Sequence, residues 1–266
     1  MTEIAAALVK ELRDRTGAGM MECKRALQET NGDVDAAQRL LRERGAASAQ
    51  KRAGRETTEG VVLMRTEDGR GALVAIGCET EPVSKNDEFR AFAERVLEAA
   101  YGGELEQKGD ELERQRTELV GKIGENVVIV GTARFEAVNG ATIDGYVHPP
   151  ANKLGVLVQL RGGSEELARK VAMHIAASAP QWIGRDDVPE DVVATERDIY
   201  TNSDEVQSKP EQAREKIVEG MLGKRFFAAQ VLTEQPWIHD SAKTVGQALQ
   251  EDGAEVLEFE RFSLAR

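Results

Sequence analysis

The stretch GALVAIGCETEPVSKNDEFRAFAERVLEAA, residues 71–100, decides the fold. Its first part, GALVAIG, is a short apolar run that predicts a buried strand. Its last part, FRAFAERVLEAA, has apolar residues at helical spacing and predicts a helix. Between them lie Thr80, Glu81, Pro82 and Val83, although a short turn is enough to join a strand to a helix. The fold alone does not explain this connection.

A second strand precedes this stretch, and the resulting strand–strand–helix pattern returns later in the chain. Upstream, VVLMRTEDGR adds a strand that joins the first through Asp68-Gly69, a typical hairpin turn. Downstream, strands are predicted at Ala141–His148 and Leu154–Gly162, followed by a helix at Ser164–Ser178. Ser164 is a favoured helix N-cap. We therefore expect an α+β fold whose core consists of two related ββα-type subdomains.

The N-terminal segment, residues 1–54, predicts a compact module of three short helices. Ile4, Leu8 and Leu12 recur at helical spacing, and the glycines of TGAG and NGD interrupt the helical pattern twice. Asp33 is expected to cap the third helix and Gly45 to end it.

A second helical region stands between two β-rich parts of the C-terminal half. Val192 and Ile199 are seven residues apart, as are Val193 and Tyr200, and this repeat predicts an antiparallel helical hairpin with a short coiled-coil seam. It is inserted into the second subdomain, which continues with predicted strands in AAQVLTEQPWI and AEVLEFERFSL. The expected boundaries are 1–54 for the helical module, 55–140 for the first core subdomain, 141–183 and 227–266 for the second, and 184–226 for the hairpin.

The composition excludes several classes of protein. The net charge of −12 is unsuited to direct binding of nucleic acid or of an anionic membrane, and the basic run at Gln50–Arg55 is interpreted as a solvated linker. No apolar run approaches the roughly 20 residues of a membrane span, and the start of the chain does not have the pattern of a signal peptide. The two cysteines form no CxxC motif, which favours a reducing compartment and a cytoplasmic protein.

Motifs for chemistry are missing from the sequence. There is no phosphate-binding GxxxxGK[ST], and the three histidines, His148, His174 and His239, have no metal-ligand spacing. Glu79 and Glu81 are read as solvated carboxylates, and Cys78 as a small buried residue. We therefore expect no catalytic residues, no metal site and no cofactor, and a protein that is not an enzyme.

One long block and several short ones carry a resemblance to a known family. The sequence VKELRDRTGAGMMECKRALQETNGDVDAA, residues 9–37, strongly resembles the start of bacterial elongation factor Ts. GKIGENVVI, GVLV, VAMHIAAS, EQP and KTVGQAL resemble later blocks in the same order. The resemblance implies a guanine-nucleotide exchange factor that binds elongation factor Tu, both GDP-bound and nucleotide-free. It also implies an N-terminal three-helix UBA-like module, a core of two related subdomains and an inserted helical hairpin.

The resemblance also implies which residues bind the partner. In the family, a Thr-Asp-Phe-Val loop disturbs the Mg²⁺ and phosphate site of elongation factor Tu, and residues 80–83 match this loop. Glu81 keeps the charge of the aspartate, whereas Pro82 replaces the aromatic residue. The N-terminal contact surface corresponds to Arg13, Met20, Met21 and Lys24, and the core contacts to His148, Ile238 and His239.

The chain departs from the family sequence in two further places, and the sequence leaves two other hypotheses on function open. Val130-Gly131 stands where many relatives have two arginines, and the sequence ends at Arg266 where many carry a further helix. A divergent paralogue that binds elongation factor Tu without exchange, as a chaperone or sequestering partner, is the second hypothesis. An unrelated α+β enzyme that uses Cys78 or the acidic loop is the third. The hairpin could form a homodimer or a 2:2 complex, dock on the partner, or do neither.

Overall fold

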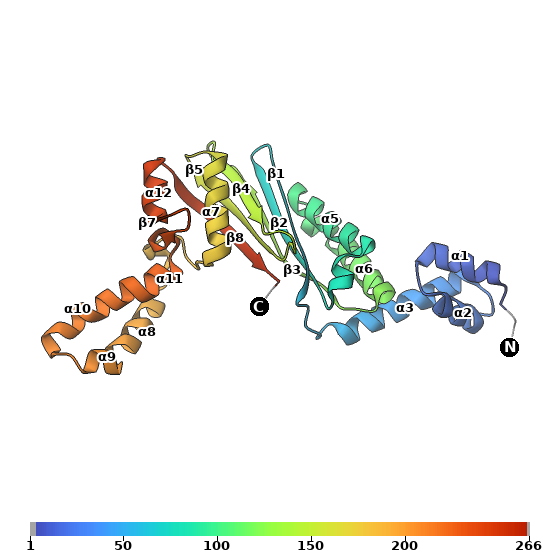
Figure 1. Ribbon diagram of the computed structural model, residues 1–266. Coiled ribbons are helices and arrows are strands. Elements are labelled where there is room, and N and C mark those ends of the chain that lie inside the picture. The colour runs from blue at the N-terminus through green and yellow to red at the C-terminus, as the bar shows by residue number, and fades with distance from the viewer. Residues whose placement is uncertain (1–3, 265–266) are drawn as a thin grey trace.

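The computed structural model describes residues 4–264 (Figure 1). A small helical module lies at one end, a helical hairpin lies at the other, and two β-sheets with their helices stand between them. The mixture of helices and antiparallel sheets confirms the predicted α+β class.

The N-terminal module consists of α1 (Ala6–Thr16), α2 (Met20–Glu29) and α3 (Val34–Arg52). As predicted, Asp33 caps α3, because its Oδ1 accepts a hydrogen bond from the Ala36 N–H at 2.9 Å. The module has its own apolar cluster, whose buried members are Val9, Leu12, Ala18, Cys23, Ala26, Leu27 and Ala37.

The prediction that Gly45 ends the third helix is wrong, since α3 continues to Arg52. Gly45 lies where α3 crosses α6 (Leu105–Ile123), and a Cβ on Gly121 of α6 would lie 3.0 Å from the Gly45 Cα. Both glycines allow the two helix backbones to approach each other. The module is therefore fixed to the core through the second half of α3.

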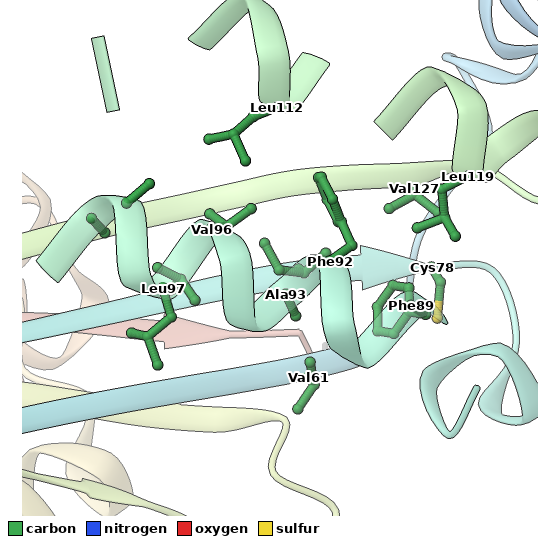
Figure 2. Close-up of a cluster of buried hydrophobic side chains, with 14 of the residues drawn as sticks. Val61, Cys78, Phe89, Phe92, Ala93, Val96, Leu97, Leu112, Leu119 and Val127 are labelled. Atoms are coloured by element: carbon green, nitrogen blue, oxygen red, sulfur yellow. The ribbon is translucent and has the colours of Figure 1, made fainter. Parts of the chain in front are cut away.

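The first core sheet contains β1 (Glu59–Glu67), β2 (Arg70–Cys78) and β3 (Val127–Glu136), in the antiparallel order β1-β2-β3. Helix α5 (Asp87–Gly102) covers one face, and α6 packs on α5. Figure 2 shows Phe89, Phe92 and Val96 of α5 in one apolar cluster with side chains of the sheet and of α6.

The second sheet repeats this arrangement with β4 (Thr142–Val147), β5 (Leu154–Arg161) and β8 (Glu255–Ser263), in the order β4-β5-β8. Its helix is α7 (Glu165–Ser178). The Ser164 hydroxyl accepts a hydrogen bond from the Leu167 N–H at 3.2 Å, which confirms the predicted N-cap.

Register details show that the two halves are related. The β2–β3 pairing shifts between Ala75 and Ile76, and the β5–β8 pairing shifts between Gln159 and Leu160. Both shifts fall at the same point when Gly71 is aligned with Gly155. Matching bulges are conserved features of a fold, so this agreement supports an internal duplication.

The two sheets pack face to face around an apolar cluster, with the helices outside. Gly71 and Gly155 make this contact close and reciprocal. A Cβ on Gly71 would lie 2.9 Å from Leu157 Cδ1, and a Cβ on Gly155 would lie 3.0 Å from Leu73 Cδ1. Each glycine thus makes room for the leucine of the other sheet.

The hairpin is formed by α8 (Glu190–Thr201), the short helix α9 (Asp204–Gln207) and α10 (Glu211–Met221). After α10 the chain continues through the π-helical turn η2 (Leu222–Phe227) and α11 (Ala228–Gln230), and the turn η1 (Arg185–Asp187) precedes α8. Val192, Val193 and Tyr200 pack in the hairpin cluster as the seven-residue repeat predicts. Ile199 does not, because its side chain is 56% exposed.

The strand predicted for AAQVLTEQPWI is wrong in its first part. Residues 228–230 are helical, the turn η3 (Leu232–Glu234) follows, and only β6 (Pro236–Trp237) is extended, paired with β7 (Asp240–Thr244). The apolar residues there are buried by contacts with the segment before the hairpin, where the Leu232 N–H donates to the Trp182 carbonyl at 2.8 Å. Helix α12 (Val245–Glu251) follows β7.

Candidate partner-binding site

The connection between β2 and α5 is a short helix and not an open loop. Helix α4 (Glu81–Ser84) is a single turn, with Pro82 near its start, where the missing N–H costs little. Thr80, Glu81 and Pro82 are exposed, whereas Val83 is 9% exposed and packs in the core cluster of the first sheet. In this conformation Val83 anchors the turn, and the three residues before it form its surface.

A second segment holds this turn from outside. The Glu125 carboxylate, just after α6, accepts a hydrogen bond from the Thr80 N–H at 3.0 Å and one from the Thr80 hydroxyl at 2.6 Å. Its neighbour Asn126 donates its own N–H to Glu79 Oε1 at 2.7 Å. Hydrogen bonds to charged groups are stronger than neutral ones, so these two segments are firmly joined.

The electrostatics of this region do not favour acid–base or thiol chemistry. Burial, together with a smaller contribution from the charge of Glu125, raises the pKa of the Cys78 thiol to about 12. The thiol therefore stays neutral and is unsuited to act as a nucleophile. The Glu81 carboxylate pairs with Lys85 at 2.7 Å, and this hydrogen bond lowers the pKa of Glu81. Glu79 and Glu81 face different partners and do not form a pair.

The four residues expected on the N-terminal surface are all exposed. Arg13 lies on α1 and the other three lie at the start of α2, where the side chains of Met20 and Met21 are 58% and 61% exposed. Neither methionine is therefore part of the module's core. Two exposed methionines beside Lys24 form an adaptable surface of the kind that is common at protein interfaces.

Lys122 connects this surface with the core. Its Nζ lies 3.1 Å from Glu88 Oε2 in the first turn of α5. The same side chain fills the space next to Gly17, where an added Cβ would lie 2.7 Å from Lys122 Nζ. The glycine turn before Met20 and the beginning of α5 are thus held by one lysine.

His148 belongs to the turn between β4 and β5, which lies close to β1. The Val62 N–H donates to the Asn152 carbonyl at 2.7 Å, and Lys153 Nζ lies 2.5 Å from Glu59 Oε1. The His148 ring is exposed, and its Nδ1 lies 2.8 Å from the Tyr146 hydroxyl. Because Lys153 also lowers the pKa of Glu81, this turn and α4 lie within electrostatic reach of each other.

Ile238 and His239 lie on the second half of the core, against α7. Their side chains are exposed, while the neighbouring Trp237 is buried. The His239 ring contacts the Trp237 ring at a centroid distance of 4.7 Å, and its Nε2 lies 3.2 Å from the Lys170 carbonyl oxygen.

The sequence did not identify the residue that fixes this segment. His174 of α7 is fully buried, its Nε2 lies 2.9 Å from Gln235 Oε1, and its Nδ1 accepts from the Ile238 N–H at 3.4 Å. Burial lowers the pKa of His174, so the neutral ring makes both contacts. Nothing in the local sequence indicated this pair, because the two side chains are brought together only by the fold.

Neither a metal site nor a membrane helix is found in the part of the chain that the structure describes. No group of three or more His, Cys, Asp or Glu side chains within residues 4–264 could hold a metal ion. No described helix is long and apolar enough to cross a bilayer.

Comparison with known proteins identifies the family. The sequence profile described as Elongation factor TS matches residues 79–266. Elongation factor Ts of Alkalilimnicola ehrlichii is 44% identical and covers 98% of this chain and 92% of the relative. Elongation factor Ts of Pasteurella multocida is 45% identical, with 99% and 93% covered. These similarities extend over nearly the whole chain, and the protein belongs to the elongation factor Ts family.

Proposed function

We propose that this protein is the guanine-nucleotide exchange factor for elongation factor Tu and acts in translation elongation in the cytoplasm. The observation that carries the proposal is the exposed turn Thr80–Pro82, which the protein holds against its core through hydrogen bonds from Thr80 to Glu125. Membership in the elongation factor Ts family supports it. The protein then works by binding and breaks no covalent bond.

The proposed mechanism follows from charge and position. The turn enters the nucleotide-binding domain of elongation factor Tu, and the Glu81 carboxylate and the rigid Pro82 ring occupy space beside the Mg²⁺ and phosphate site. A carboxylate there competes with the phosphates for the same cationic surroundings. Thermodynamic linkage requires that the factor weakens nucleotide binding by the same ratio by which nucleotide weakens factor binding.

The size of this coupling requires several contacts. Changing a partner from mostly nucleotide-bound to mostly factor-bound takes a differential affinity of about 5.5 kcal/mol. A turn of three exposed residues is too small to supply all of this, because most interface side chains cost less than about 1 kcal/mol when truncated. We therefore assign the rest to Arg13, Met20, Met21 and Lys24 at one end, and to His148, Ile238 and His239 on the core.

The test is release of a fluorescent GDP from elongation factor Tu as a function of factor concentration. Pro82→Phe is expected to increase the release rate several-fold, because an aromatic side chain fills more of the contact. Met20→Ala is expected to raise the concentration for half-maximal release and to leave the maximal rate similar. If Pro82→Phe has no effect and Met20→Ala abolishes release, the turn does not drive exchange.

A factor that binds without exchange is the competing function, and the family comparison does not favour it. The same experiment separates the two, since stable complex formation with GDP release at the background rate would establish the competitor. Failure of the protein to form any complex with nucleotide-free elongation factor Tu would exclude both.

For the hairpin we propose a contact with a second copy of the chain, which would give a homodimer or a 2:2 complex. The support is Ile199, a large apolar side chain that is 56% exposed on α8 outside the hairpin cluster. Sedimentation of the wild type and of Ile199→Lys tests this, and a wild type that remains monomeric throughout would overturn it. With a net charge of −12, we propose no direct contact with nucleic acid or with a membrane.

A further inference from the structure

Two segments far apart in the sequence are joined beside α4, because the carboxylate of each accepts hydrogen bonds from the other. The Thr80 N–H and hydroxyl both donate to Glu125, at 3.0 and 2.6 Å. In return, the Asn126 N–H donates to Glu79 Oε1 at 2.7 Å. We call these four residues, Glu79, Thr80, Glu125 and Asn126, the carboxylate latch.

Further contacts extend the latch to the start of β1. Glu79 also accepts from Arg55 Nη1, at 3.3 and 3.4 Å to its two oxygens. The Asn126 side chain donates from Nδ2 to the Arg55 carbonyl at 2.9 Å. Asn126 is 1% exposed, so one partner of the latch is fixed in the protein interior.

The latch uses a group that would ordinarily stabilise the helix itself. Thr80 stands at the N-cap position of α4, where a threonine hydroxyl usually accepts a hydrogen bond from the first turn. Here the hydroxyl donates to Glu125, and within the described residues no side chain caps α4. A helix of four residues is far too short to be stable alone.

The other contacts that tie α4 to the core lie at its far end. Val83 is buried in the core cluster, and Arg90 Nε donates to the Ser84 carbonyl at 3.2 Å. The exposed half, Thr80 to Pro82, is joined to a distant segment through the latch. Its other hydrogen bonds are local: Cys78 Sγ donates to the Thr80 carbonyl, the Ser84 hydroxyl to the Glu81 carbonyl, and Lys85 to the Glu81 carboxylate. Without Glu125, the first half of the turn would keep these local contacts and the fixed φ of Pro82, but Thr80 would lose both of its hydrogen bonds to a distant segment.

We propose that Glu125 is a positioning residue that, with Glu79, holds Thr80, Glu81 and Pro82 as a preformed wedge for the nucleotide-binding domain of the partner. The inference rests on the proposed exchange function, and it identifies Glu125 as the group that shapes the surface proposed to contact the partner. A preformed segment pays less ordering entropy on binding. The latch therefore raises the fraction of encounters in which the wedge is ready to displace nucleotide.

The first arm of the test needs no partner. Amide hydrogen exchange is measured at Thr80, whose N–H binds Glu125, and at Ser84, whose N–H donates to the Thr80 carbonyl at 3.3 Å. Glu125→Ala is expected to increase exchange at both amides about tenfold, and Glu125→Gln by less, because the amide keeps one acceptor. Unchanged protection of Ser84 in Glu125→Ala would overturn the latch, whether or not the protein binds elongation factor Tu.

The second arm measures fluorescent GDP release at saturating factor. Glu125→Ala is expected to lower the maximal rate about tenfold, which corresponds to about 1.4 kcal/mol, and Glu125→Gln should recover part of it. The matched control is Glu98→Ala, because the Glu98 carboxylate, like that of Glu125, accepts hydrogen bonds through both oxygens, here from Arg65 at 2.8 and 3.1 Å, but lies away from the latch. The control is expected to leave the rate unchanged.

The outcomes separate the latch from the exchange function. A loosened turn with an unchanged maximal rate would overturn the positioning role of Glu125. A wild type without exchange activity would overturn the proposed function, and hydrogen exchange would still decide whether the latch exists. An equal loss of rate in Glu98→Ala would show that the effect comes from general destabilisation and would also overturn the proposal.

Discussion

The two halves of the core have the same construction but differ in how the second strand joins the helix. In the second half, β5 reaches α7 through Gly162, Gly163 and the capping Ser164. In the first half, β2 reaches α5 through residues 79–86, which include α4 and both Glu79 and Thr80 of the latch. The second half thus shows that the short turn is sufficient for the fold.

Each half also has an insertion at the same place, between its helix and its third strand. In the first half this is α6, on which the N-terminal module docks; in the second it is the hairpin with the segment 228–254. The shared elements build the core, and the partner-binding residues proposed above lie mostly outside them. The comparison shows that a repeated scaffold carries different insertions at equivalent positions, and we propose that its binding surfaces differ accordingly.

The largest loss of stability is expected when the two glycines at the sheet–sheet contact are replaced by alanine. A Cβ at Gly71 would lie 2.6 Å from Ile143 Cγ2, and one at Gly155 would lie 2.5 Å from Val62 Cγ1. We expect Gly71→Ala and Gly155→Ala to lower the free energy of unfolding by similar amounts, about 3 kcal/mol each, in urea denaturation.

The control for this pair is Gly220→Ala on α10, where an added Cβ would meet nothing within 4 Å. Alanine there should stabilise the protein by up to about 1 kcal/mol, because glycine is a poor helix former. If Gly71→Ala and Gly155→Ala differ widely, the two halves are not packed as equivalents.

The next largest effect is expected where equivalent helix positions differ in chemistry. Val96 of α5 and His174 of α7 each lie ten residues after their N-caps, Asn86 and Ser164 (96 − 86 = 174 − 164 = 10). The first is apolar, and the second holds Gln235 and the Ile238 N–H. His174→Phe should lower the free energy of unfolding by about 2 kcal/mol at pH 8, because a buried polar group loses its partner.

The pH dependence of the same variant gives an independent check. Since burial lowers the pKa of His174 below its ordinary 6.5, the unfolded chain takes up a proton before the folded one does. Stability contributed by the neutral ring is therefore present above about pH 6.5 and is lost as the pH falls toward the folded pKa. His174→Phe should lose this part of the slope, and His239→Phe, which keeps the buried ring, should not.

A smaller effect is expected at the crossing of α3 and α6, which has no counterpart in the second half. Gly121→Leu should separate the module from the core, because the side chain would enter the space occupied by the Gly45 backbone. The free energy of unfolding should change by less than about 1 kcal/mol if the core is unaffected. Limited proteolysis between residues 53 and 58 should become several-fold faster, and Gly109→Leu on the open side of α6 should not change it.

The smallest effects are expected for exposed ion pairs at the starts of the helices. Lys85 pairs with Glu81 in the first half, and Lys170 pairs with Glu166 in the second, each at 2.7 Å and each between residues four apart. Lys85→Ala and Lys170→Ala should each leave the midpoint of urea denaturation nearly unchanged, because solvent-exposed ion pairs contribute little to stability. A larger change for Lys85→Ala alone would show that this pair also supports α4.

The sequence predicts well what is decided by near neighbours. The hairpins, the helices that follow them, and the caps at Asp33 and Ser164 depend on residues within a few positions, and all are present. The exposure of Met20 and Met21 also has a local component, because adjacent helical side chains cannot both face one core.

What the sequence did not predict depends on partners far along the chain. Gly45 resembles a helix end until Gly121 is placed against it. The apolar residues near Val231 resemble a strand, but their burial comes from the segment at Trp182. The latch joins Thr80 to Glu125 in the same way, so a local pattern shows that the connection is unusual but not what holds it.

Because α3 is continuous, the orientation of the N-terminal module depends on the length of this helix. The helix runs from Val34 to Arg52 without interruption, so it acts as a rigid spacer between the module and β1. Each residue adds about 1.5 Å and a rotation of about 100°. Removing a single residue between the module and the α6 crossing would therefore turn Met20 and Met21 to another side of the molecule, and only changes near a whole number of turns would preserve their direction.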